Sequence, residues 1–482
     1  MVDKADYIFG MSGTSEKNKH RNSFRKLIDE VCGNSQDEGV LAARSFLKKW
    51  VPRKSEELPY WQEICGPHGK WVALKLEGDG GFIHERPEVR KLWKNFIDRR
   101  EYPRGINLVD GQIHDLQTQY SQFPFGTGAS LVSFNKEAYE SYGKHRGENA
   151  PISVKAEFRS SSALKYLLDS KTQRLRIGDA TTLFWTEQKT TTESFLGIVL
   201  NPKSEDETEN VSVRKFLNAV RKGILPNELR KEEGIKFYIL GLALNQARLA
   251  LRFWYVCSVA ELMRRLGDHF NSLEMERVSE KDIETPGIWH LLKETARETK
   301  DISPVLGGAL MRAILTGSPY PMSLYQGVIG RIRADRRVSY LRASILKAVL
   351  KRNYNKEIPM SLNTERRETA YLLGRLFAVL GKAQRDALGE INTTIKDRYF
   401  SAAASTPGSV FPRLLQLSQH HIEKAEYGLI SDKRIGEIVE HIEGFPLQMD
   451  LQDQGLFAIA YYQQKNEIYR KRVTTTEGEN HE

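Results

Sequence analysis

Cysteine is scarce in this chain of 482 residues, which holds only Cys32, Cys65 and Cys257. Three widely spaced cysteines cannot form the disulfide framework of a small secreted protein or a zinc site of the Cys-x-x-Cys kind. Such sparing use of cysteine favours a reducing compartment. We therefore expect a cytoplasmic protein that is held together by an apolar core.

Unbroken apolar runs are also missing. The most apolar stretch, residues 237–262, is interrupted by polar and charged residues between positions 245 and 252, whereas a membrane span needs about 20 apolar residues in a row. The first six residues contain no apolar signal core. The sequence therefore predicts neither a membrane segment nor an export signal.

Catalytic motifs are weak throughout. The glycines at 126 and 128 do not continue into a Walker phosphate loop, and no Gly-x-Ser-x-Gly elbow is present. His114 and Asp115 resemble the dyad of a metal-dependent phosphohydrolase, yet no companion cluster with metal-ligand spacing follows. We therefore expect no catalytic residue, metal or cofactor. A metal-dependent nuclease built on His114 and Asp115 is the alternative.

Positive charge is abundant instead, since 72 Lys and Arg residues exceed 62 Asp and Glu residues and give a net charge of +10. A basic surplus indicates a polyanionic partner without proving one. The apolar share of 40% is too high for a disordered protein, and over this length it suffices for two or three packed domains.

The local patterns predict an α+β fold with a mixed N-terminal body over residues 1–358. Runs of β-formers at 235–243 and 248–256, separated by a short turn, indicate two paired strands. The polar, acidic stretch at 201–210 has too few apolar residues to pack and is expected to be a surface loop. Shorter strand-like pieces occur at 71–76 and 129–134, and helical spacing takes over from about Ser258.

A C-terminal α-helical bundle is predicted over residues 362–472, followed by a disordered tail at 473–482. Apolar residues at intervals of three and four between Leu373 and Ala387 predict a helix of about five turns with one apolar stripe. Further helices are predicted at 391–404, 409–424, 431–443 and 451–469. Ser431 is the expected cap of the third of these.

The strongest electrostatic feature is a basic run in which Asp335 is the single acid. Its cations are Arg331, Arg333, Arg336, Arg337, Arg342, Lys347, Lys351 and Arg352. Phosphates spaced along a nucleic-acid strand would relieve the repulsion within this run. The alternative is a solvated helix face whose charges meet carboxylates from elsewhere in the fold.

Two further groups of cations are candidates for nucleic-acid contact. On the bundle, Arg367, Arg375, Lys382 and Arg385 are expected to form an outward ridge opposite the apolar stripe, which Lys396, Arg398 and Arg413 extend. Ordinary solubilising charge is the alternative there.

In the glycine-containing stretch 142–151, Lys144, Arg146 and Asn149 are donors that can approach a sugar-phosphate chain. A plain connection between strands, which would have the same composition, is the alternative.

Many blocks of the chain resemble one known family. They are LVSFN at 131–135, ESYGK at 140–144, NAP at 149–151, IGDATT at 177–182, FW at 184–185, YILGL at 238–242, RFW at 252–254, RAILTG at 312–317, PYP at 319–321, RIRAD at 331–335, YLLGRLFA at 371–378, DRYF at 397–400, FPRLL at 411–415 and DQGLF at 453–457. In this order they are similar to the large subunit of the type I-C CRISPR Cascade surveillance complex.

The resemblance implies a non-catalytic subunit of an RNA-guided complex. Its implied partners are the guide RNA with the backbone and handle-binding subunits, the target duplex DNA, the displaced single strand, and a separate nuclease-helicase. The implied roles are recognition of the protospacer-adjacent motif, support of the R-loop and recruitment of the nuclease-helicase, while base pairing supplies sequence specificity. The bundle resembles a Cascade small subunit. A structural scaffold without direct DNA contact is the remaining alternative.

Two departures from the family pattern are visible. The chain is expected to be shortened at its start, and residues 105–125 drift from the pattern, with His114-Asp115 among the residues that differ. Functions tied to those parts are not carried over.

The resemblance also implies that a small subunit can be translated from within the gene, and Met360 stands just before the predicted bundle. We predict an internal start at Met360. Mass spectrometry of complexes expressed from the intact gene is expected to reveal a fragment of residues 360–482, and its absence would count against the internal start.

Overall fold

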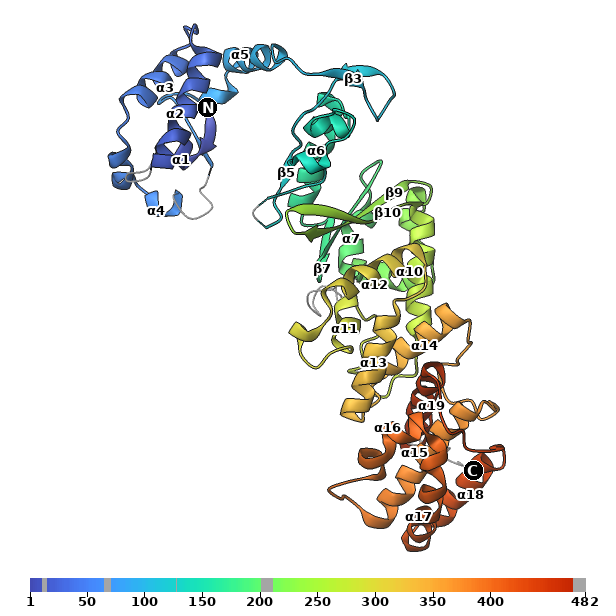
Figure 1. Cartoon of the computed structure of the whole chain (residues 1–482). Helices are drawn as coiled ribbons and strands as arrows, with labels where there is room; N and C mark the ends of the chain where they lie inside the picture. The colour runs from blue at the N-terminus through green and yellow to red at the C-terminus, as the bar shows by residue number, and fades with distance from the viewer. Residues whose placement is uncertain (11–14, 65–70, 127, 201–210, 471–482) are drawn as a thin grey trace, which may run out of the picture. The chain divides into compact units, whose positions relative to one another are not determined.

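The computed structural model describes residues 1–10, 15–64, 71–126, 128–200 and 211–470 (Figure 1). Helices and strands alternate in the body and helices alone form the last part of the chain, so the predicted α+β class is confirmed. The predicted loop at 201–210 and the predicted tail at 473–482 lie outside the described residues. No helix in the described part of the chain is both long enough and apolar enough to cross a membrane.

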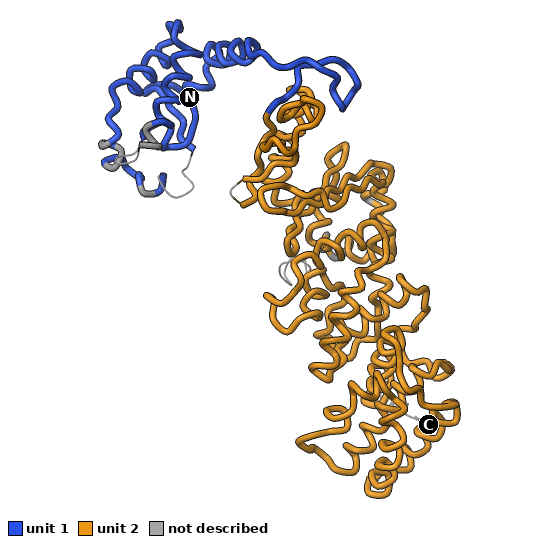
Figure 2. Tube along the Cα trace, in the orientation of Figure 1, with its two compact units in different colours: residues 1–118 blue, residues 119–482 orange. Residues whose placement is uncertain are grey.

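The chain divides into two compact units at residue 118, and Figure 2 colours them separately. The first unit contains β1 (Val2–Lys4), α1 (Ala5–Ile8), α2 (Ser15–Cys32), α3 (Glu38–Lys49), α4 (Trp61–Ile64), β2 (Trp71–Ala73), α5 (Pro87–Asp98), β3 (Arg104–Ile106) and β4 (Ile113–Asp115). Ile8, Phe24 and Leu47 join α1, α2 and α3 in a small apolar core. The strand predicted at 71–76 is confirmed over its first three residues, which pair antiparallel with β1.

A six-stranded sheet forms the start of the second unit, in the order β5-β6-β10-β9-β8-β7. Its strands are β5 (Gln122–Phe123), β6 (Ala129–Ser130), β7 (Arg174–Ile177), β8 (Ala180–Thr186), β9 (Lys236–Asn245) and β10 (Arg248–Ser258). The two strands predicted from β-formers are β9 and β10, and they pair antiparallel as expected. Gln246 takes a φ of 55°, the left-handed conformation that a two-residue hairpin turn requires.

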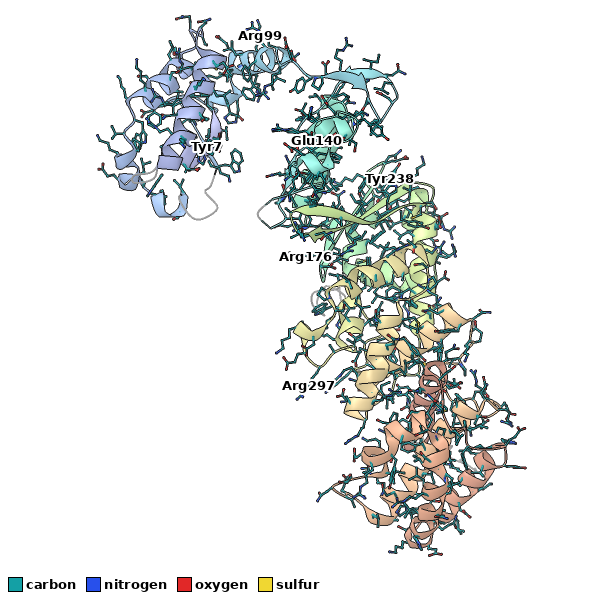
Figure 3. All side chains as sticks on the ribbon, in the orientation of Figure 1. Tyr7, Arg99, Glu140, Arg176, Tyr238 and Arg297 are labelled. Carbon is teal, nitrogen blue, oxygen red and sulfur yellow. The ribbon has the colours of Figure 1, made fainter. Side chains whose placement is uncertain are left out.

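The two faces of the sheet have different surroundings. Phe237 and Ile239 point into the largest apolar core of the chain. The opposite face is covered in part by helix α6 (Val154–Asp169). On that face Trp185, Tyr238 and Trp254 lean on one another with ring centroids 5.5 to 6.1 Å apart, and Tyr238 is labelled in Figure 3. Such cross-strand aromatic contacts stabilise the three central strands.

Helices make up most of the rest of the second unit. They are α7 (Thr191–Leu200), α9 (Val211–Arg221), α10 (Val259–Leu273), α11 (Ile288–Lys293), α12 (Pro304–Thr316), α13 (Met322–Asp335), α14 (Tyr340–Tyr354), α15 (Thr369–Leu388), α16 (Ile395–Ser405), α17 (Phe411–Lys424), α18 (Gly428–Val439) and α19 (Leu451–Tyr469). The last five include the predicted bundle helices, and α19 has the predicted bounds. Ser431 lies inside α18 rather than at its start, so the predicted cap is wrong.

Helix α15 is the central helix of this region. Every residue from Ala370 to Leu380 is buried, because α17, α18 and α19 all pack against it. The prediction of a single apolar stripe with an outward basic ridge is therefore wrong for this part of the helix. At Gly374 a side chain would collide with the backbone carbonyl of Phe457, so the absence of a Cβ lets α15 and α19 approach closely.

The large apolar core is continuous from Leu175 to Tyr462 and includes residues of both the sheet and the last helices. The boundary near residue 360 between body and bundle stays a prediction, because the division at residue 118 concerns a different part of the chain.

Candidate nucleic-acid interface

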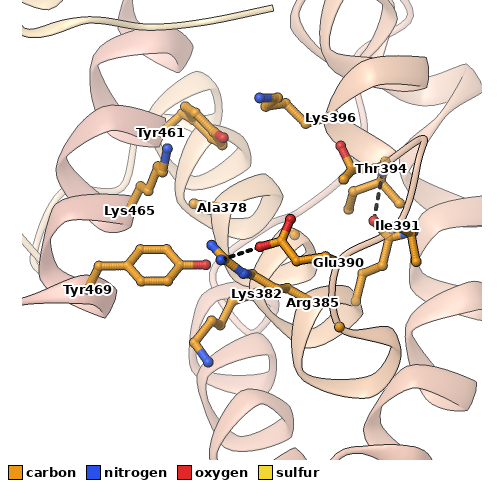
Figure 4. A pocket seen from close by; sticks show the side chains of 14 residues that line it. Ala378, Lys382, Arg385, Glu390, Ile391, Thr394, Lys396, Tyr461, Lys465 and Tyr469 are labelled. Atoms are coloured by element: carbon orange, nitrogen blue, oxygen red, sulfur yellow. Dashed lines mark hydrogen bonds and ion pairs between the residues drawn. The ribbon is translucent and has the colours of Figure 1, made fainter.

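Cations from three helices gather around a pocket of about 160 Å³ (Figure 4). We call this group the cationic pocket; its cations are Lys382 and Arg385 of α15, Lys396 of α16 and Lys465 of α19, and the acidic residue Glu390 lines it as well. The rings of Tyr461 and Tyr469 line the same pocket. These segments are up to 83 residues apart in sequence, so the cluster exists only because α15, α16 and α19 pack side by side.

Local sequence signals explain why side chains of α15, α16 and α19 line the pocket. Tyr461, Lys465 and Tyr469 recur every four residues, which puts them on one face of α19. Gly389 ends α15 with a φ of 65°, a conformation that glycine adopts without strain. The side chain of Thr394 caps α16 by accepting a hydrogen bond from the backbone N–H of Asp397, and this start places Lys396 in the first turn.

Two of the four cations are partly neutralised. Arg385 donates to a carboxylate oxygen of Glu390 at 2.7 Å, and Lys382 is paired with Asp386. Both cations also lie over the ring of Tyr469, at 5.9 Å for Lys382 and 5.8 Å for Arg385. Within the described residues, Lys396 and Lys465 have no carboxylate at ion-pair distance.

The pKa of Lys465 reflects the positive charges that surround it. Desolvation by the surrounding protein is the largest cause that lowers the pKa of Lys465, and the positive charges of Lys396, Arg337 and Arg385 lower that pKa further. Each of these effects disfavours the charged ammonium. A bound anion would act in the opposite direction, because it favours the charged form of every cation in the group.

The basic run predicted for nucleic-acid contact divides into internal and exposed members. Arg342 is 8% exposed and donates to Glu294 at 2.7 Å and to Asp335 at 2.6 Å. Arg331 also pairs with Asp335, at 2.5 Å, and Arg333 donates to the side-chain oxygen of Gln454. The charges of these arginines meet partners within the fold, and of the three only Arg342 meets a carboxylate from another segment, Glu294.

Arg336 and Arg337 are the exposed members of that run. They follow α13, where Arg336 takes the left-handed conformation that ends the helix, with a φ of 52°. The charge of Arg336 acts on Asp397 and that of Arg337 acts on Lys465. The fold therefore brings the middle of the predicted basic run within electrostatic range of α16 and of Lys465 in the cationic pocket. Farther along the run, Lys347 and Arg352 donate to backbone carbonyls of Glu274 and Ala313.

The predicted ridge on the bundle is not formed as expected. Arg375 is 7% exposed and donates to Gln464 at 3.0 Å and to the carbonyl of Thr364 at 3.3 Å. Its assignment to an exposed surface is wrong, because its stretch of α15 is buried on all sides. Arg398 and Arg413 are exposed on α16 and α17, outside the lining of the cationic pocket.

The predicted loop exposes two of its three candidates, Lys144 and Arg146. Asn149 uses its amide within the loop, where it donates to the carbonyls of Lys144 at 2.8 Å and Arg146 at 3.1 Å and accepts from the N–H of Ser141 at 3.2 Å. It orders the loop rather than extending from it. Tyr142 is 100% exposed at the tip, a residue that the charge pattern did not single out.

The dyad of the alternative nuclease lies on the β3–β4 hairpin. His114 and Asp115 are neighbours on β4, so their side chains alternate between its two faces. His114 contacts Asp110 at 3.0 Å, and Asp115 lies 3.7 Å from Arg104. Over the described ranges, no group of three or more His, Cys, Asp or Glu residues is arranged to hold a metal ion.

Sequence reasoning missed Lys465 and Tyr469, which belong to the cationic pocket. Lys465 belongs neither to the basic run at 331–352 nor to the predicted cationic face of the helix around 373–387. The signal available in the sequence was the four-residue spacing of Tyr461, Lys465 and Tyr469. Aromatic residues next to cations at helical spacing are typical of surfaces that hold nucleic acid.

Comparisons with known proteins give the family. The chain matches the family model of the CRISPR-associated protein Cas_Csd1 over residues 1–469. No curated protein matches the chain. Because the family model covers nearly the whole sequence, from the first unit to the end of α19, the chain belongs to the Cas_Csd1 family of CRISPR-associated proteins, the large subunits of type I-C Cascade complexes.

Proposed function

We propose that this chain is a non-catalytic, DNA-binding Cascade subunit and that the cationic pocket, together with Arg336 and Arg337, holds phosphates of the displaced DNA strand. The observation that carries the proposal is the convergence of the cations of α15, α16 and α19 on one pocket. Within the described residues, Lys396 and Lys465 have no carboxylate at ion-pair distance, so they are available to an external anion.

The energetics of R-loop formation suit such a site. Exchanging a DNA duplex for an RNA–DNA duplex is nearly balanced in free energy, so a few added contacts decide the direction. Each phosphate that a cation neutralises releases condensed counterions and adds a favourable, salt-dependent contribution. A pocket that holds the displaced strand therefore stabilises the open state without reading its sequence.

The exposed loop around Tyr142 has the chemistry for a second contact. Lys144 and Arg146 offer cations to a phosphate backbone, and the ring of Tyr142 offers a flat surface to a base. Asn149 keeps the loop ordered, which lowers the entropy lost on binding. We assign this loop to the target duplex near the protospacer-adjacent motif. Recruitment of the nuclease-helicase by the assembled complex completes the proposed role.

The proposal is tested by reconstituting the chain with guide RNA and the backbone subunits and measuring the affinity for target DNA over a series of salt concentrations. We expect a steep linear fall of log affinity with log salt, and tighter binding to targets that carry the correct flanking motif. Binding that is unchanged when this chain is omitted would support the scaffold alternative and contradict the proposal.

Glu390 competes with DNA for Arg385 in this arrangement, because its carboxylate occupies the same guanidinium. Glu390→Gln is expected to raise the affinity for single-stranded DNA about threefold, the size of one weak surface ion pair. Filter binding or fluorescence anisotropy measures the effect. Glu357→Gln is the matched control, since Glu357 pairs with Lys351 at 3.2 Å and does not line the pocket. Equal affinities of the two variants would show that Glu390 does not compete.

A further inference from the structure

Strands β3 and β4 form a hairpin that pairs with no other strand of the described chain. Four large aliphatic side chains near its end are exposed, and we call them the apolar hairpin tip: Ile106 (63% exposed), Leu108 (67%), Val109 (68%) and Ile113 (63%). Ile106 and Ile113 are directly opposite each other in the register, so they share a face. A two-stranded hairpin is at best marginally stable in water when nothing covers it.

The turn of the hairpin is held by hydrogen bonds despite its exposure. The backbone N–H of Asn107 donates to Gln112 O at 2.8 Å, and the N–H of Gly111 donates to Asn107 O at 2.9 Å. Asp110 accepts from the Asn107 amide at 2.9 Å and from the N–H of Gln112 at 3.0 Å. Polar groups of the turn are thus used within it, while the side chains of Leu108 and Val109 are exposed. A surface that is ordered before binding loses little entropy when it docks.

The charge of the hairpin argues against nucleic acid as its partner. Residues 104–115 contain one cation, Arg104, and two carboxylates, Asp110 and Asp115, which gives a net charge of −1. The N–H of Gln112 is the main cause that holds the pKa of Asp110 below its ordinary value, so that carboxylate stays charged at neutral pH. Arg104 already faces Asp115. The hairpin therefore offers a phosphate no free cation.

The same charges disfavour a symmetric contact between two copies of the chain, because it would bring hairpins of like charge together. The occupant that these charges leave open is a groove on a different protein, and family membership gives this chain the context of a Cascade complex.

We propose that the apolar hairpin tip is a docking element that inserts into an apolar groove, with cations at its rim, on another protein subunit of the complex. Burying four aliphatic side chains from water supplies the affinity. Cations at the rim complement Asp110 and Asp115. This inference rests on family membership and is independent of the proposed phosphate contacts.

Photo-cross-linking in the assembled complex tests the partner. A photoreactive phenylalanine derivative replaces Val109 in the full chain, the complex is reconstituted with guide RNA and the backbone subunits, and cross-linked species are identified by mass spectrometry. We expect a cross-link to another protein subunit. The same probe at Leu41, an exposed aliphatic residue of α3, is the control. A cross-link to RNA, to a second copy or to residues 119–482 of the same chain, or the absence of any cross-link, would overturn the proposal.

Charge substitution gives a second readout. The double variant Leu108→Asp, Val109→Asp is expected to bind the backbone subunits at least about tenfold more weakly, since carboxylates would have to enter an apolar groove. Its thermal unfolding is expected to match that of the unsubstituted chain, because both side chains are exposed. The affinity of the isolated chain for DNA is also expected to stay the same, which separates this inference from the proposed function. Unaltered assembly of the double variant would contradict it.

Discussion

Replacing both Lys396 and Lys465 with glutamate is expected to weaken binding to single-stranded DNA by at least about tenfold at moderate salt. Two cations without carboxylate partners among the described residues become two anions in a pocket that already holds Glu390. The slope of log affinity against log salt is expected to become shallower by about 1.4, since each lost phosphate contact on a single strand contributes about 0.7. Fluorescence anisotropy over a salt series measures both quantities.

The matched control is the double variant Lys424→Glu, Lys433→Glu. These lysines are exposed on α17 and α18, so the control changes the net charge of the same region by the same amount without touching the cationic pocket. We expect the control to retain most of the affinity and nearly the whole salt slope. If both double variants lose affinity equally, only the overall charge matters, and the pocket has no special role.

Arg342→Met is expected to lower the free energy of unfolding by about 3 kcal/mol, although its position belongs to the basic run first assigned to nucleic acid. The side chain of Arg342 is 10% exposed and pairs with Glu294 and Asp335, so its removal leaves Glu294 half-buried without its cation. Urea unfolding measured by tryptophan fluorescence gives the value. DNA affinity of the folded variant is expected to change less than about twofold, since the guanidinium is directed into the protein.

Arg264→Met is the control for this prediction. Arg264 forms an exposed pair with Asp268 at 3.3 Å on α10, and such pairs contribute less than about 0.5 kcal/mol. A similar loss of stability in both variants would contradict the structural role of Arg342. So would a large loss of DNA affinity with unchanged stability.

The stability difference between Arg342→Met and the unsubstituted chain depends on pH through Asp335. Burial opposes the charged carboxylate, but the hydrogen bonds and charges of Arg342 and Arg331 outweigh it and hold the pKa of Asp335 below its ordinary value of 3.8. A lowered pKa in the folded state means that the stabilisation is present above the ordinary value and is lost as the pH falls through the folded value. The difference between the two proteins is therefore expected to shrink below about pH 4.

The helices and the central hairpin were predictable because their signals are local. The β-formers around the turn at Gln246 predicted β9 and β10, and the helix predicted at 451–469 is α19 with the same bounds. Helix α18 begins at Gly428 and not at the predicted Ser431, because Ser431, a frequent cap residue, is buried inside the helix. The preference of serine for the end of a helix contributes less to stability than the packing of the apolar residues around Ser431.

The candidate site was predictable only in part. Abundant positive charge, the basic run and the family resemblance follow from the order of residues alone. Which cations remain free depends on carboxylates and helices that are distant in sequence: Glu294 lies 48 positions from Arg342, and Gln464 lies 89 positions from Arg375. Residue order therefore accounts for the total charge and the periodicity of the helices. Folding selects which charges face water, because each buried cation must find a partner and only the remaining cations are open to an external anion.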